Sequence, residues 1–384
     1  MLPLLCSAPC FNLRVRGVFG MVFLFETKMK NKRLRVIIAC GGTGGHIYPG
    51  LATAQVLQQR GHDVALWLSG QRDVEKHVAS GAGMNIFHTR AVPLGVKNVF
   101  QFCASFFRCL RAMRGAKPDV LLAMGSYSSL PPVAGARLCH VPVVLHEANA
   151  RPGKAVEFLA RFAEKIALTY AESAEGLPKG KTVVTGMPIR TAQLKRVLDR
   201  PREQDAPATF FVTGGSQGAL RVNQLASGAF ALMKKQGAKN LRVIHQTGVL
   251  DEKPMAAFYA REKIDARVSA FIQDMGAAYA EADVVIARAG AATCAELAYC
   301  GVPAVFIPLP SATRDHQTAN AQSFVSAGAG VCCAQSETTS ETLAKLLMEL
   351  CNDPARLGAM RGKALALATT DAAEKLADVV EGVC

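Results

Sequence analysis

The sequence lacks the patterns that mark several large classes of protein. No apolar run is long enough to cross a bilayer, so no transmembrane helix is predicted. Among the 12 cysteines there is no C-x-x-C pair and no cysteine–histidine cluster with zinc spacing, so reduced thiols in a cytosolic protein are expected. An Asp-x-Asp pair of the kind that holds a metal-bound nucleotide is also missing.

Acidic residues are scarce in the first third of the chain. Residues 1–125 carry 16 Lys and Arg against 5 Asp and Glu, and the whole chain has a net charge of +14. This excess favours an anionic partner for the first half: a membrane surface, a nucleic acid or a phosphorylated substrate. The 384 residues exceed one ordinary core, and strand-like runs alternate with helical ones, which predicts an α/β protein of two domains.

Glycine-rich loops follow two predicted strands, one near the start of each half. Gly41-Gly-Thr-Gly-Gly-His46 follows the strand Leu34–Ala39, and Gly214-Gly-Ser-Gln-Gly218 follows a strand that ends near Thr213. Such loops let backbone N–H groups face a ligand. The first loop is not the G-x-G-x-x-G fingerprint, so a nicotinamide cofactor is not expected. Two such openings predict two similar Rossmann-like domains facing a cleft.

The stretch Asp283–Asn320 reads as a βαβ unit. Val284–Ala287 and Ala304–Ile307 have the composition of buried strands, and Ala291–Tyr299 has that of a helix. Because a helix N-terminus favours an anion, a phosphate is expected at the start of this helix.

Three polar side chains of the same stretch have two interpretations. Glu296 and Gln317 suit the recognition of sugar hydroxyls beside a bound phosphate. Thr293-x-x-Glu296 also matches a capping box, in which Glu296 only closes its own helix, and Gln317 and Asn320 also suit ordinary polar caps.

Two further segments carry candidate residues. His146-Glu-Ala-Asn149 follows a buried strand, where α/β sites form, although His146 and Glu147 also suit hydrogen-bonded packing. Asn98–Met113 has helical spacing, a wide apolar face and interleaved basic residues. Such a helix either covers the sheet or lies in an anionic membrane interface. Residues 1–33 are interpreted as an extension outside the fold, from a misassigned start or, as the alternative, touching a membrane.

The order of these motifs resembles one family. Gly41–Leu51, His146–Asn149, Thr213–Ala219 and Arg288–Asn320 resemble the MurG family, the UDP-N-acetylglucosamine transferases that complete the lipid-linked disaccharide of peptidoglycan. The resemblance runs from about residue 34 to the C-terminus. It implies a GT-B fold: two Rossmann-like α/β domains with parallel sheets facing a central cleft. We place these domains at residues 34–189 and 190–365, with a helix at about 366–384 packing back on the first.

The resemblance also implies a reaction. N-acetylglucosamine would pass with inversion from UDP-GlcNAc to the 4-hydroxyl of undecaprenyl-diphosphate-linked MurNAc-pentapeptide. The enzyme would act at the cytoplasmic face of the inner membrane, as a peripheral protein on the anionic lipid surface. The resemblance implies no cofactor, no catalytic metal and no nucleic-acid partner.

Individual site residues follow from the resemblance as well. His46 is the candidate base, Ile272 would read the uracil through its backbone, and Glu296 would bind the ribose. Arg190 and Ser216 would hold the diphosphate. The residues expected at UDP-GlcNAc are Thr43, Gly44, Gly45, Asn149, Arg190, Ser216, Ile272, Ala291, Ala292, Thr293, Cys294, Ala295, Glu296 and Gln317. Those expected at the membrane are Phe102, Phe106, Arg108, Arg111 and Arg114.

Several positions depart from the family's pattern. Ala148 stands where the family has Gln, Met187 where it has Asn, and Ser126 where it has a second glycine. These changes keep two related activities open: transfer to another lipid, and epimerisation of UDP-GlcNAc. A third hypothesis, a non-catalytic basic protein that binds membranes or nucleic acid, predicts salt-dependent binding and no affinity for UDP.

Overall fold

The computed structural model describes residues 32–70, 75, 83–92, 95–194, 208–238 and 240–384. The predicted extension at residues 1–33 lies almost wholly outside these residues. Leu34–Cys384 forms one compact unit.

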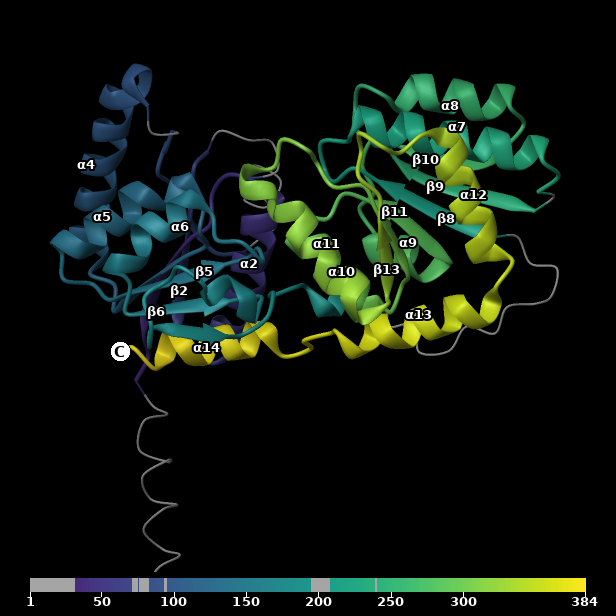
Figure 1. The fold of residues 1–384 in the computed structure, drawn as a ribbon. Helices are drawn as coiled ribbons and strands as arrows, with labels where there is room; N and C mark the ends of the chain where they lie inside the picture. Colours follow the sequence, from purple (N-terminus) through teal and green to yellow (C-terminus); the bar gives the residue numbers. More distant parts are fainter. Residues whose placement is uncertain (1–31, 71–74, 76–82, 93–94, 195–207, 239) are drawn as a thin grey trace, which may run out of the picture. The chain divides into compact units, whose positions relative to one another are not determined.

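Leu34–Cys384 contains two parallel sheets built from short apolar runs (Figure 1). Most of their strands are buried on both faces, as is usual when helices cover both sides of a parallel sheet. The seven-stranded sheet has the order β3-β2-β1-β4-β5-β6-β7, and its strands are β1 Arg35–Ala39, β2 Asp63–Leu68, β3 Asn85–His88, β4 Val120–Ala123, β5 Val143–Glu147, β6 Lys165–Leu168 and β7 Thr182–Val184.

The six-stranded sheet repeats the same topology. Its order is β10-β9-β8-β11-β12-β13, and its strands are β8 Ala208–Thr213, β9 Leu241–Gln246, β10 Asp265–Ser269, β11 Val284–Ala287, β12 Ala304–Phe306 and β13 Gly330–Cys332. In each sheet the first strand is central, and the chain order reverses between it and the fourth. Ligands of open α/β sheets bind beyond the carboxyl ends of the strands at such a point. The GT-B arrangement predicted from the sequence is confirmed.

Helices connect the strands and cover the sheets. They are α2 Gly44–Gln59, α4 Val99–Ala116, α5 Leu130–Leu138, α6 Lys154–Leu159, α7 Leu220–Lys235, α8 Glu252–Arg261, α9 Met275–Glu281, α10 Ala291–Cys300, α11 His316–Ala327, α12 Ser340–Cys351, α13 Pro354–Ala366 and α14 Ala372–Glu381. The end of α10 shows how local sequence sets a boundary. Gly301 adopts φ 71°, and an added Cβ there would lie 2.6 Å from Leu365, so only glycine fits this C-cap.

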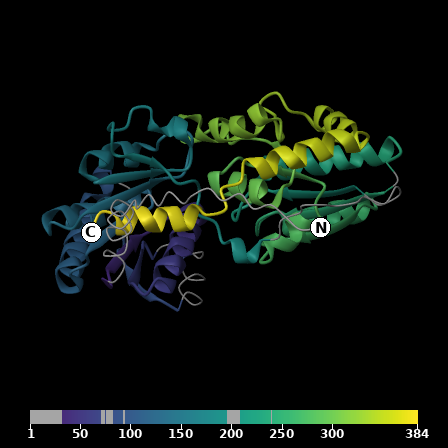
Figure 2. The ribbon, with the colours of Figure 1, turned by 90° about the horizontal axis from the view of Figure 1, so that it is seen from below.

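The last helix belongs to the core of the first sheet rather than the second. Leu376, Ala377 and Val380 of α14 are buried in the same apolar cluster as β1 and α2. Arg60, just after α2, also bonds Asp378 at 2.7 Å and Glu381 at 3.0 Å. Figure 2 shows α14 (yellow) running beside α2 (purple). The chain therefore crosses between the two sheets twice, after β7 and again after α13.

Candidate functional site

The loop between β1 and α2 depends on two glycines and a buried carboxylate. Gly42 adopts φ 113°, and a Cβ added at Gly41 would lie 2.5 Å from the backbone nitrogen of Ser69, so the turn requires both glycines. The carboxylate of Glu75 is fully buried and accepts from Gly42 N at 2.9 Å and from Ser69 Oγ at 2.7 Å. Sequence reasoning missed Glu75, because nothing near it in the chain shows that it meets the glycine loop.

His46 stands in the first turn of α2. Its Nδ1 is 2.9 Å from Thr43 Oγ1, the hydroxyl of the residue that precedes the helix. Burial and the nearby His316 of α11 lower the pKa of His46 to about 4. The ring is therefore neutral at physiological pH. If Nδ1 donates to Thr43, the lone pair of Nε2 is the one that can take a proton.

The loop after β5 is organised by Glu147. This buried carboxylate accepts from the backbone and side-chain nitrogens of Asn149 at 2.8 and 3.1 Å, and from Gly153 N at 2.8 Å. His146 is also buried, with Gly186 O and Thr169 Oγ1 both 3.5 Å from Nε2. Of the two interpretations of His146 and Glu147, hydrogen-bonded packing is the one that the structure supports.

Asn320 connects this loop to the second sheet. Its fully buried amide accepts from Ala150 N at 2.8 Å and donates to Asn149 Oδ1 at 3.2 Å and to Ala289 O at 3.1 Å. Asn320 is therefore not an ordinary cap. Gln317 instead accepts from Leu309 N at 2.9 Å and holds the loop after β12.

The capping-box interpretation of Glu296 is wrong. Gly290 is the N-cap of α10, and no side chain caps this helix. Glu296 Oε2 accepts from the hydroxyl of Tyr279 on α9 at 2.9 Å. Burial raises the pKa of Glu296, while that hydrogen bond and the charge of Arg190 oppose the rise. The start of α10 thus presents backbone N–H groups with a half-buried carboxylate one turn further on.

Four other residues expected at the nucleotide lie in four different segments. Arg190 has its guanidinium carbon 4.2 Å from the ring centre of Tyr48 on α2 and acts on Glu296 electrostatically. Ser216 is exposed in the loop between β8 and α7. The backbone N–H of Ile272 donates to Gln246 Oε1 at 2.9 Å. Cys294 is buried, and burial raises the pKa of its thiol to about 12, so only its backbone can face a ligand.

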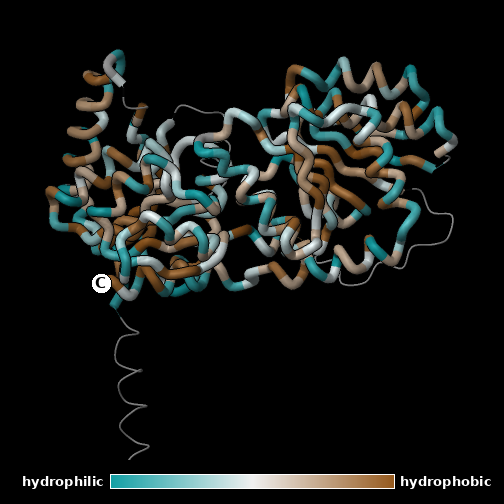
Figure 3. Tube along the Cα trace, viewed as in Figure 1, coloured by the Kyte–Doolittle hydropathy of each residue, from teal (hydrophilic) through white to brown (hydrophobic). Residues whose placement is uncertain are grey.

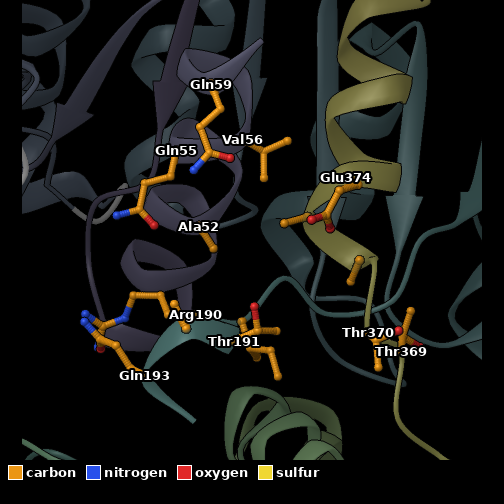
Figure 4. A pocket seen from close by; sticks show the side chains of 14 residues that line it. Ala52, Gln55, Val56, Gln59, Arg190, Thr191, Gln193, Thr369, Thr370 and Glu374 are labelled. Atoms are coloured by element: carbon orange, nitrogen blue, oxygen red, sulfur yellow. The ribbon is translucent and has the colours of Figure 1, made fainter.

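A cavity of about 200 Å³ lies between α2, α14 and the segment after β7 (Figure 4). Gln55 and Gln59 of α2, Arg190 and Gln193 after β7, and Glu374 of α14 line it. Of the residues expected at UDP-GlcNAc, only Arg190 lines this cavity. The cavity lies where the two segments that cross between the sheets, after β7 and after α13, come close to each other. We do not assign it to the donor.

Two of the departures from the family's pattern meet in space. Ala148 and Met187 are buried in one apolar cluster with Ile189 and with Ala291 at the start of α10. Where the family's pattern predicts a polar pair, this chain therefore has an apolar pair in a single contact region. The third departure, Ser126, lies against the first glycine loop, where its Oγ would be 2.9 Å from a Cβ added at Gly42.

Restoring one member of that polar pair is expected to destabilise the fold. Met187→Asn buries an amide in a cluster whose one polar contact to this side chain is Thr169 Oγ1, 3.5 Å from Met187 Sδ, and this costs about 1–3 kcal/mol of unfolding free energy. Adding Ala148→Gln to Met187→Asn should restore at least about 0.5 kcal/mol of unfolding free energy, because the two amides can then form a hydrogen bond with each other. Thermal denaturation of both single variants and the double variant measures this coupling. Met187→Leu, which keeps the site apolar, is the control, and strictly additive losses would contradict the prediction.

Helix α4 divides its aromatic residues between the core and the surface. Cys109 and Met113 are buried against the sheet, Phe102 and Phe106 are half-buried, and Phe100 and Phe107 are 86% and 65% exposed. Figure 3 shows hydrophobic residues (brown) along α4. Phe100 and Phe107 lie on the same face of the helix as the exposed Arg111 and Arg114. Arg108 instead donates from Nε to His88 O at 2.7 Å and lies over the ring of Phe87.

Neither a spanning helix nor a metal cluster is found in the part of the chain that the structure describes. No helix there has the length and apolarity needed to cross a membrane. The same residues contain no group of three His, Cys, Asp or Glu side chains that could hold a metal ion.

Comparison with known proteins gives consistent matches. Residues 36–168 match the glycosyltransferase family 28 N-terminal domain, and residues 209–377 match the glycosyltransferase family 28 C-terminal domain. A relative from Halorhodospira halophila, named UDP-N-acetylglucosamine–N-acetylmuramyl-(pentapeptide) pyrophosphoryl-undecaprenol N-acetylglucosamine transferase, is 39% identical over 91% of this chain and 98% of its own.

Solved structures agree with the sequence matches. The crystal structure of Acinetobacter baumannii MurG is 32% identical, with a TM-score of 0.73 over 91% of this chain and 99% of that one. A UDP-GlcNAc 2-epimerase from Neisseria meningitidis has a TM-score of 0.66 over 91% of this chain and 100% of that one, at 12% identity, which shows a shared fold alone.

Proposed function

The chain belongs to glycosyltransferase family 28, and from that premise we propose that it transfers N-acetylglucosamine from UDP-GlcNAc to the lipid-linked MurNAc-pentapeptide of peptidoglycan synthesis. Residues 34–189 would receive the acceptor and residues 190–365 the donor. The observation that carries the proposal within the structure is the placement of His46 at the start of α2. Its Nδ1 lies 2.9 Å from Thr43 Oγ1, and it is near enough to His316 of α11 for the two rings to interact electrostatically.

In the proposed reaction a residue next to the first sheet acts as the base, and α10 next to the second sheet stabilises the leaving group. The 4-hydroxyl of the acceptor attacks the anomeric carbon, its proton passes to Nε2 of His46, and the bond to the UDP oxygen breaks. Thr43 holds the ring in the orientation that this transfer needs. The leaving diphosphate carries negative charge, which the N-terminus of α10 and Arg190 can stabilise.

Donor recognition is divided between loops of the second sheet and two loops of the first sheet, those after β1 and β5. We assign the ribose hydroxyls to Glu296, whose carboxylate does not cap α10 and accepts from Tyr279. Asn149 and Gln317 are assigned to the sugar, and Ser216 to the diphosphate together with Arg190. The small residues Ala291 to Ala295 let the donor come close to the start of α10. Thr43, Gly44 and Gly45 are assigned to the opposite side of the donor.

One assay tests the proposal directly. Purified protein with labelled UDP-GlcNAc and a lipid-linked muramoyl acceptor should release UDP and form a labelled lipid-linked disaccharide. A control without lipid should leave the donor unchanged. Epimerisation or hydrolysis of UDP-GlcNAc in that control would favour the epimerase, and absence of any UDP affinity would favour a non-catalytic protein.

We further propose that α4 attaches the enzyme peripherally to the anionic cytoplasmic face of the inner membrane. The exposed Phe100 and Phe107 supply apolar area, and Arg111 and Arg114 supply positive charge on the same face. The contacts of Arg108 with β3 give it a packing role instead. The proposed surface shares Arg111 and Arg114 with the set predicted from the sequence, which also includes Phe102, Phe106 and Arg108; the rings of Phe102 and Phe106 are half-buried.

Binding to vesicles tests this surface. Replacing both Phe100 and Phe107 with serine should weaken binding to anionic vesicles at least tenfold, because each exposed phenyl ring contributes about 1.5–3 kcal/mol when it enters an apolar phase. The double variant Arg111→Gln/Arg114→Gln should lose about 2 kcal/mol of binding free energy on anionic vesicles. This loss should be smaller at high salt. Phe158→Ser, which alters an exposed phenylalanine of α6, is the matched control. Equal weakening by the control would contradict the assignment.

A further inference from the structure

Gln246, the last residue of β9, joins three loops at the carboxyl edge of the six-stranded sheet. Its side chain is 3% exposed. Oε1 accepts from the backbone nitrogen of Ile272 at 2.9 Å, and Nε2 donates to Gly215 O at 3.1 Å and to Thr213 Oγ1 at 3.2 Å. A single amide therefore has polar partners at the end of β8, in the loop after β8 and in the segment after β10.

The backbones of these loops are already in contact. Gly218 and Gly248 have φ values of 75° and 82°, and a Cβ added at Gly218 would lie only 2.0 Å from Thr247 O. The loops after β8 and β9 therefore fit against each other without intervening side chains. The backbone nitrogens of Thr247 and Gly248 donate in turn to Ser269 O and Ala270 O. Gln246 completes this arrangement by connecting Ile272 to the glycine loop.

A bound uridine diphosphate must contact both the segment after β10, which contains Ile272, and the glycine loop after β8, which contains Ser216. In the proposed function, Ile272 reads the base and Ser216 holds the diphosphate, so the separation of the two segments must match the nucleoside between them. The Ile272 N–H is bonded to Gln246, and a base that used this N–H would have to share or displace the bond. An Ile272 carbonyl held in place would accept from N3–H of uracil, whereas N3 of cytosine has no proton to donate.

We propose that Gln246 is a positioning residue that sets the base-reading backbone at Ile272 against the phosphate loop at Ser216, and so supports selection of uridine nucleotides. The inference rests on the proposed function, because it requires UDP to be the ligand. Gln246 acts through Ile272 and Gly215 rather than by touching the reacting atoms.

The test compares Gln246→Ala with Gln246→Glu in the full-length enzyme. Gln246→Ala should raise the KM for UDP-GlcNAc about tenfold with kcat nearly unchanged, since it leaves the Ile272 N–H and Gly215 O without their partner. The ratio of the inhibition constants of CDP and UDP should fall toward one. Gln246→Glu keeps an oxygen that can accept from the Ile272 N–H but cannot donate to Gly215 O while ionised, so its KM should rise less than that of Gln246→Ala.

Leu347→Ala provides the control for stability alone. Leu347 is buried in the apolar core that α7 and α12 share, so its loss should lower the melting temperature without moving KM or the CDP to UDP ratio. If Gln246→Ala lowered the melting temperature but left KM and that ratio unchanged, the positioning role would be overturned. If the unchanged protein bound neither UDP nor UDP-GlcNAc, the proposed function itself would fail, which is a separate outcome.

Discussion

Replacing His46 with alanine is expected to lower turnover about 10²- to 10⁴-fold, the usual contribution of a positioned general base. The KM for UDP-GlcNAc should stay within about twofold, because the imidazole acts on the acceptor hydroxyl and not on the nucleotide. Steady-state rates with saturating donor and acceptor measure the effect. His140→Asn, which changes a histidine in the turn before β5, at the amino edge of the sheet, is the control.

The pH dependence gives a second check of the same role. A histidine that acts as a base must be neutral, so activity is lost as pH falls through its pKa. Because burial and His316 lower the pKa of His46 to about 4, full activity should persist at pH 6, where an ordinary histidine is largely protonated. An acid limb centred near pH 6.5 would contradict the lowered pKa of His46, whereas unchanged turnover in His46→Ala would remove His46 from the mechanism.

The second large effect is expected at Glu296. Glu296→Ala should raise the KM for UDP-GlcNAc about 30-fold, because hydrogen bonds to a charged group contribute about 1.5–3 kcal/mol and each 1.4 kcal/mol corresponds to a factor of ten. The melting temperature should change by only a few degrees, since Glu296 does not cap its helix. Donor kinetics and thermal denaturation of the same preparation separate the two contributions.

Tyr279→Phe is the matched control for this prediction. It removes the hydrogen bond between Tyr279 and Glu296 from the other side and leaves the carboxylate in place. The KM should therefore change much less than in Glu296→Ala. A large fall in melting temperature with an unchanged KM in Glu296→Ala would show that the carboxylate serves the fold and not the ribose.

The sequence by itself determined the fold class, most of the central strands and the order of the motifs. Runs such as Val284–Ala287 mark strands buried on both faces, and Gly301 marks the end of α10, because these features depend on residues a few positions apart. The resemblance to the family rests on such local motifs as well. The predicted domain boundaries and the donor contacts stay predictions.

Only the tertiary structure decided which partner each polar side chain takes. Thr293-x-x-Glu296 matches a capping box, yet Glu296 meets Tyr279 from the preceding helix. Gln246 and Glu75 are ordinary residues in the sequence, and each holds backbone groups of a glycine loop that lies about 30 positions away in the chain. Ala148 and Met187 read as two separate departures but share one apolar cluster. Local sequence determines turns and the hydrophobic periodicity of helices and strands. The partner of a polar side chain depends instead on how elements that are distant in the chain pack together.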